Sequence, residues 1–258
     1  MIWIGLVALV AAAICGFLAR VASVRARVME STETLPARDL SALHEAAVEA
    51  AGKGHFRYRS EIVGEARPPE NGALRSELAG LECVWHRHRI TRKYEETYRD
   101  SEGNRKRRTR TQVLSEHSSS TAFFVRDATG QVVIHPGEHE VVGAEKVLDR
   151  FDAHSRGGHR LEIGPLSLDL GGGDGTIGFQ REEWLVRPGS PFYVHGEATD
   201  ADGGLAVTAP AEGGLFIMSV KSEKELLRRE NNKVLGFGIG TAVTAVAGAV
   251  LLVLGIIY

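Results

Sequence analysis

The chain of 258 residues carries 31 lysine and arginine residues against 33 aspartate and glutamate residues, a formal net charge of -2. Dedicated nucleic-acid binders usually have a strongly basic domain, so this balance argues against nucleic acid as a partner. Only two cysteines occur. They are too few for a disulfide framework or for a cysteine-rich zinc module such as a RING.

Two long apolar segments lie at the ends of the sequence. Residues 2–19 and 235–258 contain no charged residue. A helix needs ~20 apolar residues to cross ~30 Å of hydrocarbon, so both segments are predicted to span a membrane, the first barely. Basic residues follow the first segment and none precedes it. This pattern favours a retained anchor over a cleaved signal peptide.

Basic residues flank both apolar segments on the side of the intervening region. Cytoplasmic flanks of membrane helices are enriched in lysine and arginine, so we expect a multi-pass cell-membrane protein whose central module is cytoplasmic. Both chain termini then lie outside. The flanking residues are Arg20, Arg25, Arg27, Arg228, Arg229 and Lys233.

The sequence divides into five segments. Residues 1–19 and 235–258 are the predicted transmembrane helices, and residues 20–54 are a connector followed by an amphipathic helix. Residues 55–221 form a β-rich module, and residues 222–234 form a juxtamembrane helix. The predicted fold class is therefore a membrane protein with a β-rich (α+β) soluble module between two transmembrane helices.

Local patterns place the main elements of the module. Apolar residues recur at three and four from Pro36 until Gly52, which predicts a helix. Alternation over residues 81–98 and 105–116, separated by turn-forming residues 100–104, predicts a long hairpin. Further strands are expected at residues 122–126, 131–134, 161–170, 176–187, 191–199, 204–207 and 215–220.

Two short motifs refine this description. Ser222 and Glu225 form a capping box, which predicts a helix that runs into the second membrane segment. The glycine-rich segment 171–175 is followed by a strand pattern. A phosphate loop needs a helix N-terminus there, so we interpret the segment as a flexible hairpin tip.

Ordered motifs along the chain include Cys83-Val-Trp85-x-Arg87 and Asp127-x-Thr-Gly130. Together they resemble the GIDE domain family, also called BAM for "beside a membrane". This module lies between the two transmembrane helices of a mitochondrial E3 ubiquitin ligase and of related bacterial and archaeal proteins. The resemblance covers roughly residues 40–258 and includes the placement of both membrane segments. The motif residues, which we interpret as structural, are Gly80, Cys83, Trp85, Arg87, Asp127, Gly130, Pro136 and Gly196.

The resemblance carries an enzymatic label that we do not expect to hold. The mitochondrial ligase has a RING after its second helix, whereas this sequence stops at Tyr258. We therefore expect no catalytic residues and no ubiquitin-transferase activity. No nucleophile elbow, HExxH or Walker-type motif is present either.

Two histidines are candidate metal ligands. His86 and His88 stand two apart in a predicted strand and so share one face, a spacing that can ligate metal. No acidic or cysteine partner lies in register with them. We therefore expect a polar strand face, no metal site and no cofactor.

A dense run of basic residues at 105–110 gives the most specific hypothesis about binding. One interpretation is a solvated strand end, neutralised by acidic residues across the hairpin. The other is a patch that binds anionic lipid headgroups or an acidic cytoplasmic protein. The run consists of Arg105, Lys106, Arg107, Arg108 and Arg110.

Small residues recur at every fourth position in both membrane segments. Such stripes allow close helix approach, either between the two helices of one chain or in a homo-oligomer. The sequence pattern is compatible with both alternatives. The stripes are Ala8, Ala12 and Gly16, and Gly236, Gly240, Thr244 and Gly248.

These observations favour a membrane-tethered, non-catalytic interaction or scaffold protein, or a sensor, of the GIDE type. One alternative is an E3 ubiquitin-transferase-like protein, by family resemblance. The other is a sensor of a lipid or small ligand at the membrane surface. The expected partners are the membrane itself, a cytoplasmic protein or anionic lipid.

Overall fold

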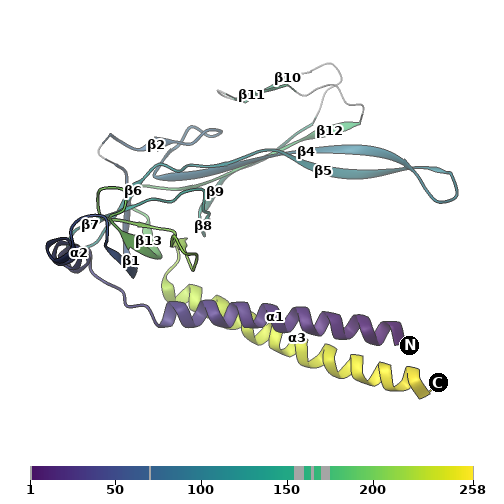
Figure 1. Ribbon diagram of the computed structural model, residues 1–258. Coiled ribbons are helices and arrows are strands. Elements are labelled where there is room, and N and C mark those ends of the chain that lie inside the picture. The colour runs from purple at the N-terminus through teal and green to yellow at the C-terminus, as the bar shows by residue number, and fades with distance from the viewer. Residues whose placement is uncertain (1, 70, 154–159, 164–165, 170–174, 258) are drawn as a thin grey trace. The chain divides into compact units, whose positions relative to one another are not determined.

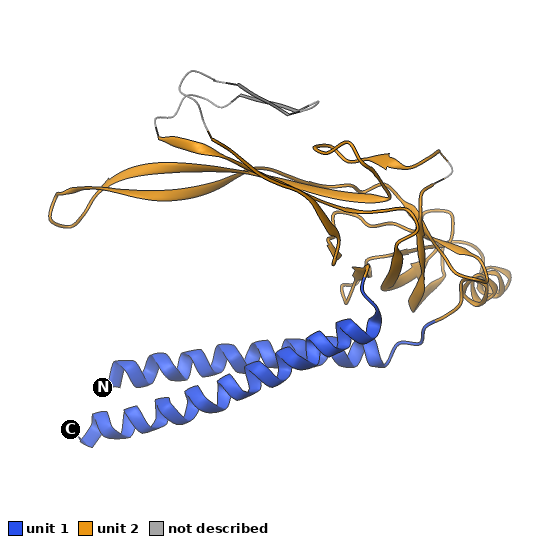
Figure 2. Cartoon of the chain, turned by 180° about the vertical axis from the view of Figure 1, so that it is seen from behind, with its two compact units in different colours: residues 1–34, 221–258 blue, residues 35–220 orange. Residues whose placement is uncertain are grey.

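The computed structural model divides the chain into two compact units (Figure 2). One unit consists of residues 1–34 and 221–258, and the other of residues 35–220. The description covers residues 2–69, 71–153, 160–163, 166–169 and 175–257.

The first unit is a pair of long helices, α1 (Ile2–Glu30) and α3 (Glu223–Ile257). Both are long and apolar enough to cross a membrane, and most of their apolar side chains are exposed. The predicted pair of spans is confirmed, and the chain is a membrane protein. Helix α1 continues beyond the apolar run, because residues 20–30 include the good helix formers alanine, arginine and methionine.

Helix α3 begins at the predicted capping box. The Glu225 N–H donates to the Ser222 hydroxyl over 3.4 Å, and the Ser222 N–H donates to the Glu225 carboxylate over 3.2 Å. These reciprocal bonds satisfy backbone donors that a helix start leaves free. The helix then runs without interruption into the apolar segment, as predicted.

Close contacts between small residues pack α1 against α3. A Cβ atom at Gly5 would lie 2.9 Å from Leu252 and 3.0 Å from the Gly248 carbonyl oxygen. Farther along, a Cβ at Gly16 would lie 3.7 Å from Thr241. The helices are therefore antiparallel, and glycine permits their close approach within one chain.

The second unit contains a small closed barrel. Its strands form one seven-stranded sheet in the order β1-β6-β7-β14-β13-β15-β8, and β1 also pairs with β13. The ring β1-β6-β7-β14-β13 therefore closes on itself, while β15 and β8 extend it. The bounds are β1 (Arg57–Arg67), β6 (Phe123–Arg126), β7 (Gln131–Ile134), β8 (Val141–Val142), β13 (Pro191–Thr199), β14 (Ala206–Thr208) and β15 (Ile217–Ser219).

Helix α2 (Ala37–Ala51) contributes Leu40 to the barrel core, which also contains Ile62 and Phe123. The helix follows Pro36 and ends at Gly52, where φ is +85°, as the sequence predicts. At its start, the Asp127 carboxylate accepts the Ala37 N–H over 2.8 Å. Asp127 thereby joins the turn after β6 to the first turn of the helix.

A second sheet has the order β5-β4-β12-β9 and leaves the barrel as a long ribbon (Figure 1). Trp85 and Val186, at the barrel ends of β4 and β12, belong to the barrel core. The sheet is thus rooted by hydrophobic burial. The bounds are β4 (Trp85–Arg99), β5 (Arg105–Ser118), β9 (Glu145–Ala153) and β12 (Thr176–Val186), with small pairs β2 (Leu74–Arg75) and β3 (Glu82–Cys83), and β10 (Arg160–Ile163) and β11 (Leu166–Asp169).

The predicted long hairpin is confirmed as β4 and β5. The single strand expected over residues 161–170 is wrong, because β10 and β11 pair with each other instead. The sequence between them is Gly164-Pro165, a dipeptide typical of turns. The prediction followed the apolar residues on both sides and gave this dipeptide no weight. The predicted hairpin tip at 171–175 falls, except for Gly175, outside the described residues.

The helix pairing predicts a disulfide. A Cβ at position 240 would lie 3.6 Å from the Cys15 sulfur, close to disulfide geometry. We expect Gly240→Cys to cross-link to Cys15 under mild oxidation, measured as loss of two free thiols by mass spectrometry. Gly236→Cys is the matched control, because its Cβ meets nothing within 4 Å. Equal oxidation of both variants would contradict this helix register.

Candidate functional site

The outer part of the β4–β5 hairpin projects beyond the other strands of its sheet (Figure 1). Strand β12 pairs with β4 as far as Tyr94, and the Glu95 N–H donates to the Gly175 carbonyl over 2.7 Å just beyond it. Farther out, residues 96–99 and 105–108 pair only with each other among the described residues. We call residues 94–110 the basic arm. Its turn is closed by Asp100, whose carboxylate accepts the N–H groups of Glu102 and Asn104 over 3.0 and 2.8 Å.

The basic arm concentrates positive charge. It holds six lysine and arginine residues against four aspartate and glutamate residues, a net charge of +2 on a chain whose net charge is -2. All five residues of the predicted basic run are exposed there: Arg105, Lys106, Arg107, Arg108 and Arg110.

Cross-strand carboxylates balance part of this charge. Glu96 accepts hydrogen bonds from Arg108 and Arg110 over 2.7 and 3.2 Å, and these bonds lower the pKa of Glu96. Arg107 lies 3.6 Å from Glu95, whereas Arg105 forms no ion pair with any described residue. The expected neutralisation across the hairpin is therefore found for part of the run, and the binding interpretation stays a prediction.

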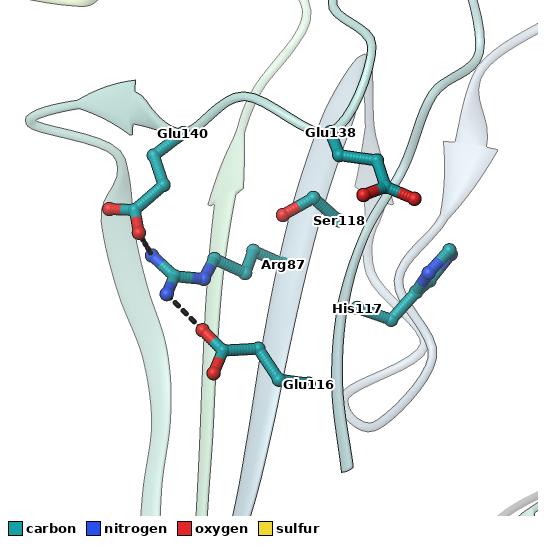
Figure 3. A pocket seen from close by; sticks show the side chains of 6 residues that line it. All are labelled: Arg87, Glu116, His117, Ser118, Glu138 and Glu140. Carbon is teal, nitrogen blue, oxygen red and sulfur yellow. Dashed lines mark hydrogen bonds and ion pairs between the residues drawn. The ribbon is translucent and has the colours of Figure 1, made fainter.

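A polar pocket of about 230 Å³ lies near the root of the hairpin (Figure 3). The Arg87 guanidinium lies between the carboxylates of Glu116 and Glu140 and forms an ion pair with each. Hydrogen bonds from Arg89 and Arg87 lower the pKa of Glu116 to about 2. The lining residues are Arg87, Glu116, His117, Ser118, Glu138 and Glu140.

His86 and His88 share one buried face of β4, as the alternation predicts. The Nδ1 atom of His88 lies 2.9 Å from a Glu77 oxygen, whose second oxygen lies 3.7 Å from Nε2 of His117. The expectation that no acidic partner lies in register with the histidines is wrong, because Glu183 of β12 lies opposite His88 in the sheet. Glu77 lies in a turn outside the strand, so strand register could not reveal it.

Hydrogen bonds and burial describe the environment of the two histidines. Among the residues that the structure describes, no group of three or more histidine, cysteine, aspartate or glutamate side chains could hold a metal ion. The Nε2 atom of His88 is hydrogen-bonded to the Ser115 hydroxyl over 3.0 Å. Burial lowers the pKa of both His86 and His88, which favours their neutral forms.

Glu183 of β12 is a buried carboxylate to which the sequence patterns assigned no role. It accepts the backbone N–H groups of Leu78 and Ala79 over 2.9 and 2.7 Å and so holds the turn that carries Glu77. Burial, aided by the charge of Glu183, raises the pKa of Cys83 to about 12. The Cys83 thiol is therefore a poor nucleophile at neutral pH.

The other motif residues occupy positions with evident packing or turn geometry. Trp85 is buried in the core, and a Cβ at Gly196 would lie 2.7 Å from the Thr208 carbonyl oxygen. Gly80 has φ +67°, a conformation that favours glycine. The carbonyl of Pro136 accepts the N–H of His139 over 3.2 Å. A Cβ at Gly130, in the turn that Asp127 closes, would lie 3.6 Å from Ala37.

Comparison with known proteins gives one match. The family model for GIDE, described as E3 Ubiquitin ligase, matches residues 93–255, more than half of the chain. The matched region begins within β4 and includes all five cations of the basic run. No curated protein and no solved structure matches the chain.

The buried histidines predict that acid destabilises the module. Burial lowers the pKa of His86 and His88 below 6.5, so the unfolded state binds more protons as the pH falls through that value. The free energy of unfolding is then highest above about pH 6.5 and decreases below it. We expect this decrease in urea unfolding of the full chain in detergent, followed by tryptophan fluorescence between about pH 7.5 and 5.5.

The double variant His86→Gln, His88→Gln should lose less stability over that pH interval than the unmodified chain. The change in stability with pH is compared, because the substitutions also alter stability at neutral pH. His55→Gln is the control, since His55 is exposed. An identical pH dependence in the double variant and the unmodified chain would show that other groups cause the acid sensitivity.

Proposed function

The chain belongs to the GIDE family, and from that premise we propose that it is a membrane-tethered interaction protein whose basic arm binds an anionic partner. The function requires no catalytic group. It is supported by the arm itself, which is exposed on both faces and contributes no side chain to the hydrophobic core. The net charge of +2 on the arm favours binding to anionic surfaces.

The two membrane helices support the tethering part of the proposal. Each end of the module continues into one helix, so the module stays beside the bilayer. Because α1 and α3 are antiparallel, the six cations that flank the apolar runs lie toward the same end of the helix pair. We propose that this end, and with it the module, is cytoplasmic.

This orientation predicts that residue 258 is outside the cytoplasm. Alkaline phosphatase fused after Tyr258 should be active, because the enzyme matures only outside, whereas green fluorescent protein fused there should be dark. The same reporters inserted at the exposed Gly52–Gly54 turn should give the opposite result. Fluorescence from the C-terminal fusion would contradict the orientation.

A second candidate function is that of a ubiquitin ligase component, which the description of the matched family model favours. In that setting the module would recruit a protein to the membrane, and the basic arm would again be the contact surface. The buried Cys83, with its raised pKa, does not suit thioester chemistry. Transfer of ubiquitin by the purified chain, in the presence of activating and conjugating enzymes, would favour this candidate.

Neutralising the arm should abolish anion binding. We expect the full chain in nanodiscs of phosphatidylcholine to bind fluorescent polyglutamate, with affinity that falls as salt rises, because exposed charges are screened within ~10 Å at 0.1 M salt. The variant with Arg105, Lys106, Arg107, Arg108 and Arg110 changed to glutamine should not bind. Its stability should change little, since exposed ion pairs contribute little to folding.

A charge-matched control separates the arm from overall charge. Five other exposed cations of the module, changed together to glutamine, should leave binding nearly intact. Equal loss in both variants would mean that the arm is only a solvated strand end. The control residues are Arg38, Lys53, Arg57, Arg59 and Arg75.

A further inference from the structure

We propose that the outer edge of β5 in the basic arm binds an extended acidic segment of a partner protein as an added β-strand. This inference rests on the proposed function of the arm and specifies its partner. Added strands of this kind obtain affinity from main-chain hydrogen bonds and specificity from alternating side chains.

The edge is open along the whole arm. Strand β5 lies at the end of its four-stranded sheet, paired with β4 on one side and with no other strand of the described residues on the other. An unpaired edge presents a row of backbone N–H and C=O groups that can pair with another chain. The arm also extends beyond β12, so its last residues form a two-stranded ribbon as far as the structure describes the chain.

The register shows which backbone groups face outward. The Asp100 N–H donates to the Asn104 carbonyl over 3.0 Å, which makes these residues a hydrogen-bonded pair. Hydrogen-bonded and non-bonded pairs alternate along an antiparallel ladder. The backbone groups of Arg105, Arg107 and Thr109 therefore point away from β4, toward an incoming strand.

The cations lie on both faces of the ribbon. Side chains alternate along a strand, so Arg105 and Arg107 project from one face and Lys106, Arg108 and Arg110 from the other. A flat lipid surface meets only one of these faces. A strand added at the edge also alternates its side chains, so acidic residues along it reach the cations of both faces.

The face with Arg105 and Arg107 has the most available charge. Arg107 is 76% exposed at 3.6 Å from its only ion-pair partner among the described residues, and Arg105 has none. These two arginines are also the residues whose backbone faces outward. One acidic strand could therefore engage the side chains and the main chain of the same residues.

The charges of β5 also disfavour a second copy of this chain as the strand that binds at this edge. Two β5 edges brought together would oppose cation to cation, and such like-charged pairs are destabilising. Charged edge strands are a common protection against self-association. The same charges that exclude a second β5 strand favour an acidic one, so the edge discriminates between the two.

A single substitution distinguishes binding by strand addition from binding by charge attraction alone. Thr109→Pro removes one outward N–H and places a ring at the open edge, while β4 pairing and all cations remain. Thr109→Val, which keeps the N–H, is the control. The probe is a fluorescent peptide of about eight residues that alternates glutamate and valine, since strands of this length are typical. The full chain is held in phosphatidylcholine nanodiscs.

We expect Thr109→Pro to weaken peptide binding ~10-fold or more, through lost hydrogen bonds and a blocked edge, and Thr109→Val to bind normally. Residue-resolved amide exchange should show new protection at Arg105, Arg107 and Thr109 when the peptide is bound. Normal binding by Thr109→Pro would overturn strand addition. So would binding to phosphatidylserine vesicles in place of the peptide, which would identify lipid as the partner.

The five-glutamine variant distinguishes failure of this inference from failure of the proposed function. If that variant loses the peptide while Thr109→Pro keeps it, the arm binds anions but not through its edge. If the five-glutamine variant binds the peptide as well as the unmodified chain, the arm is not the binding element and both proposals are wrong.

Discussion

Burial of Trp85 and Val186 in the barrel core is the interaction on which the rest of the module depends. These residues lie at the barrel ends of β4 and β12, and the Val84 N–H donates to the Val186 carbonyl over 2.9 Å at the same place. A fully buried tryptophan contributes several kcal/mol, typically about 3 to 5 by truncation. This burial fixes the barrel ends of β4 and β12 in the core. The remaining residues of β4, and the β5 residues paired with them, are positioned from that end.

Specific polar contacts lie next to this root, and those of Glu183 and His88 are buried. Glu183 binds two N–H groups of the turn that carries Glu77, and Glu77 in turn lies beside His88. On the opposite face of the sheet, Arg87 links Glu116 and Glu140. The buried Glu183 charge would cost free energy if its partners were removed, so Glu183 fixes the turn against β12.

Farther from the root, the stabilising interactions change from burial to charge. Within the described part of the chain, no third strand pairs with the end of the β4–β5 hairpin, and a two-stranded ribbon is marginally stable by itself. Its cations are held by cross-strand carboxylates and by an arginine over the Tyr98 ring at 4.9 Å. An arm held in this way keeps the outer edge of β5 unpaired among the described residues, which a docking element requires.

The sequence by itself determined the two membrane helices, the capping box, helix α2 and the long hairpin, because each depends on local periodicity or on a turn. It also located the basic run, although not which cations are neutralised. Only the tertiary structure decided the closed barrel, the pairing of β9 with β12, and the contacts of Glu77 and Glu183. These contacts join residues far apart in the chain, and neither periodicity nor spacing carries information about such pairs.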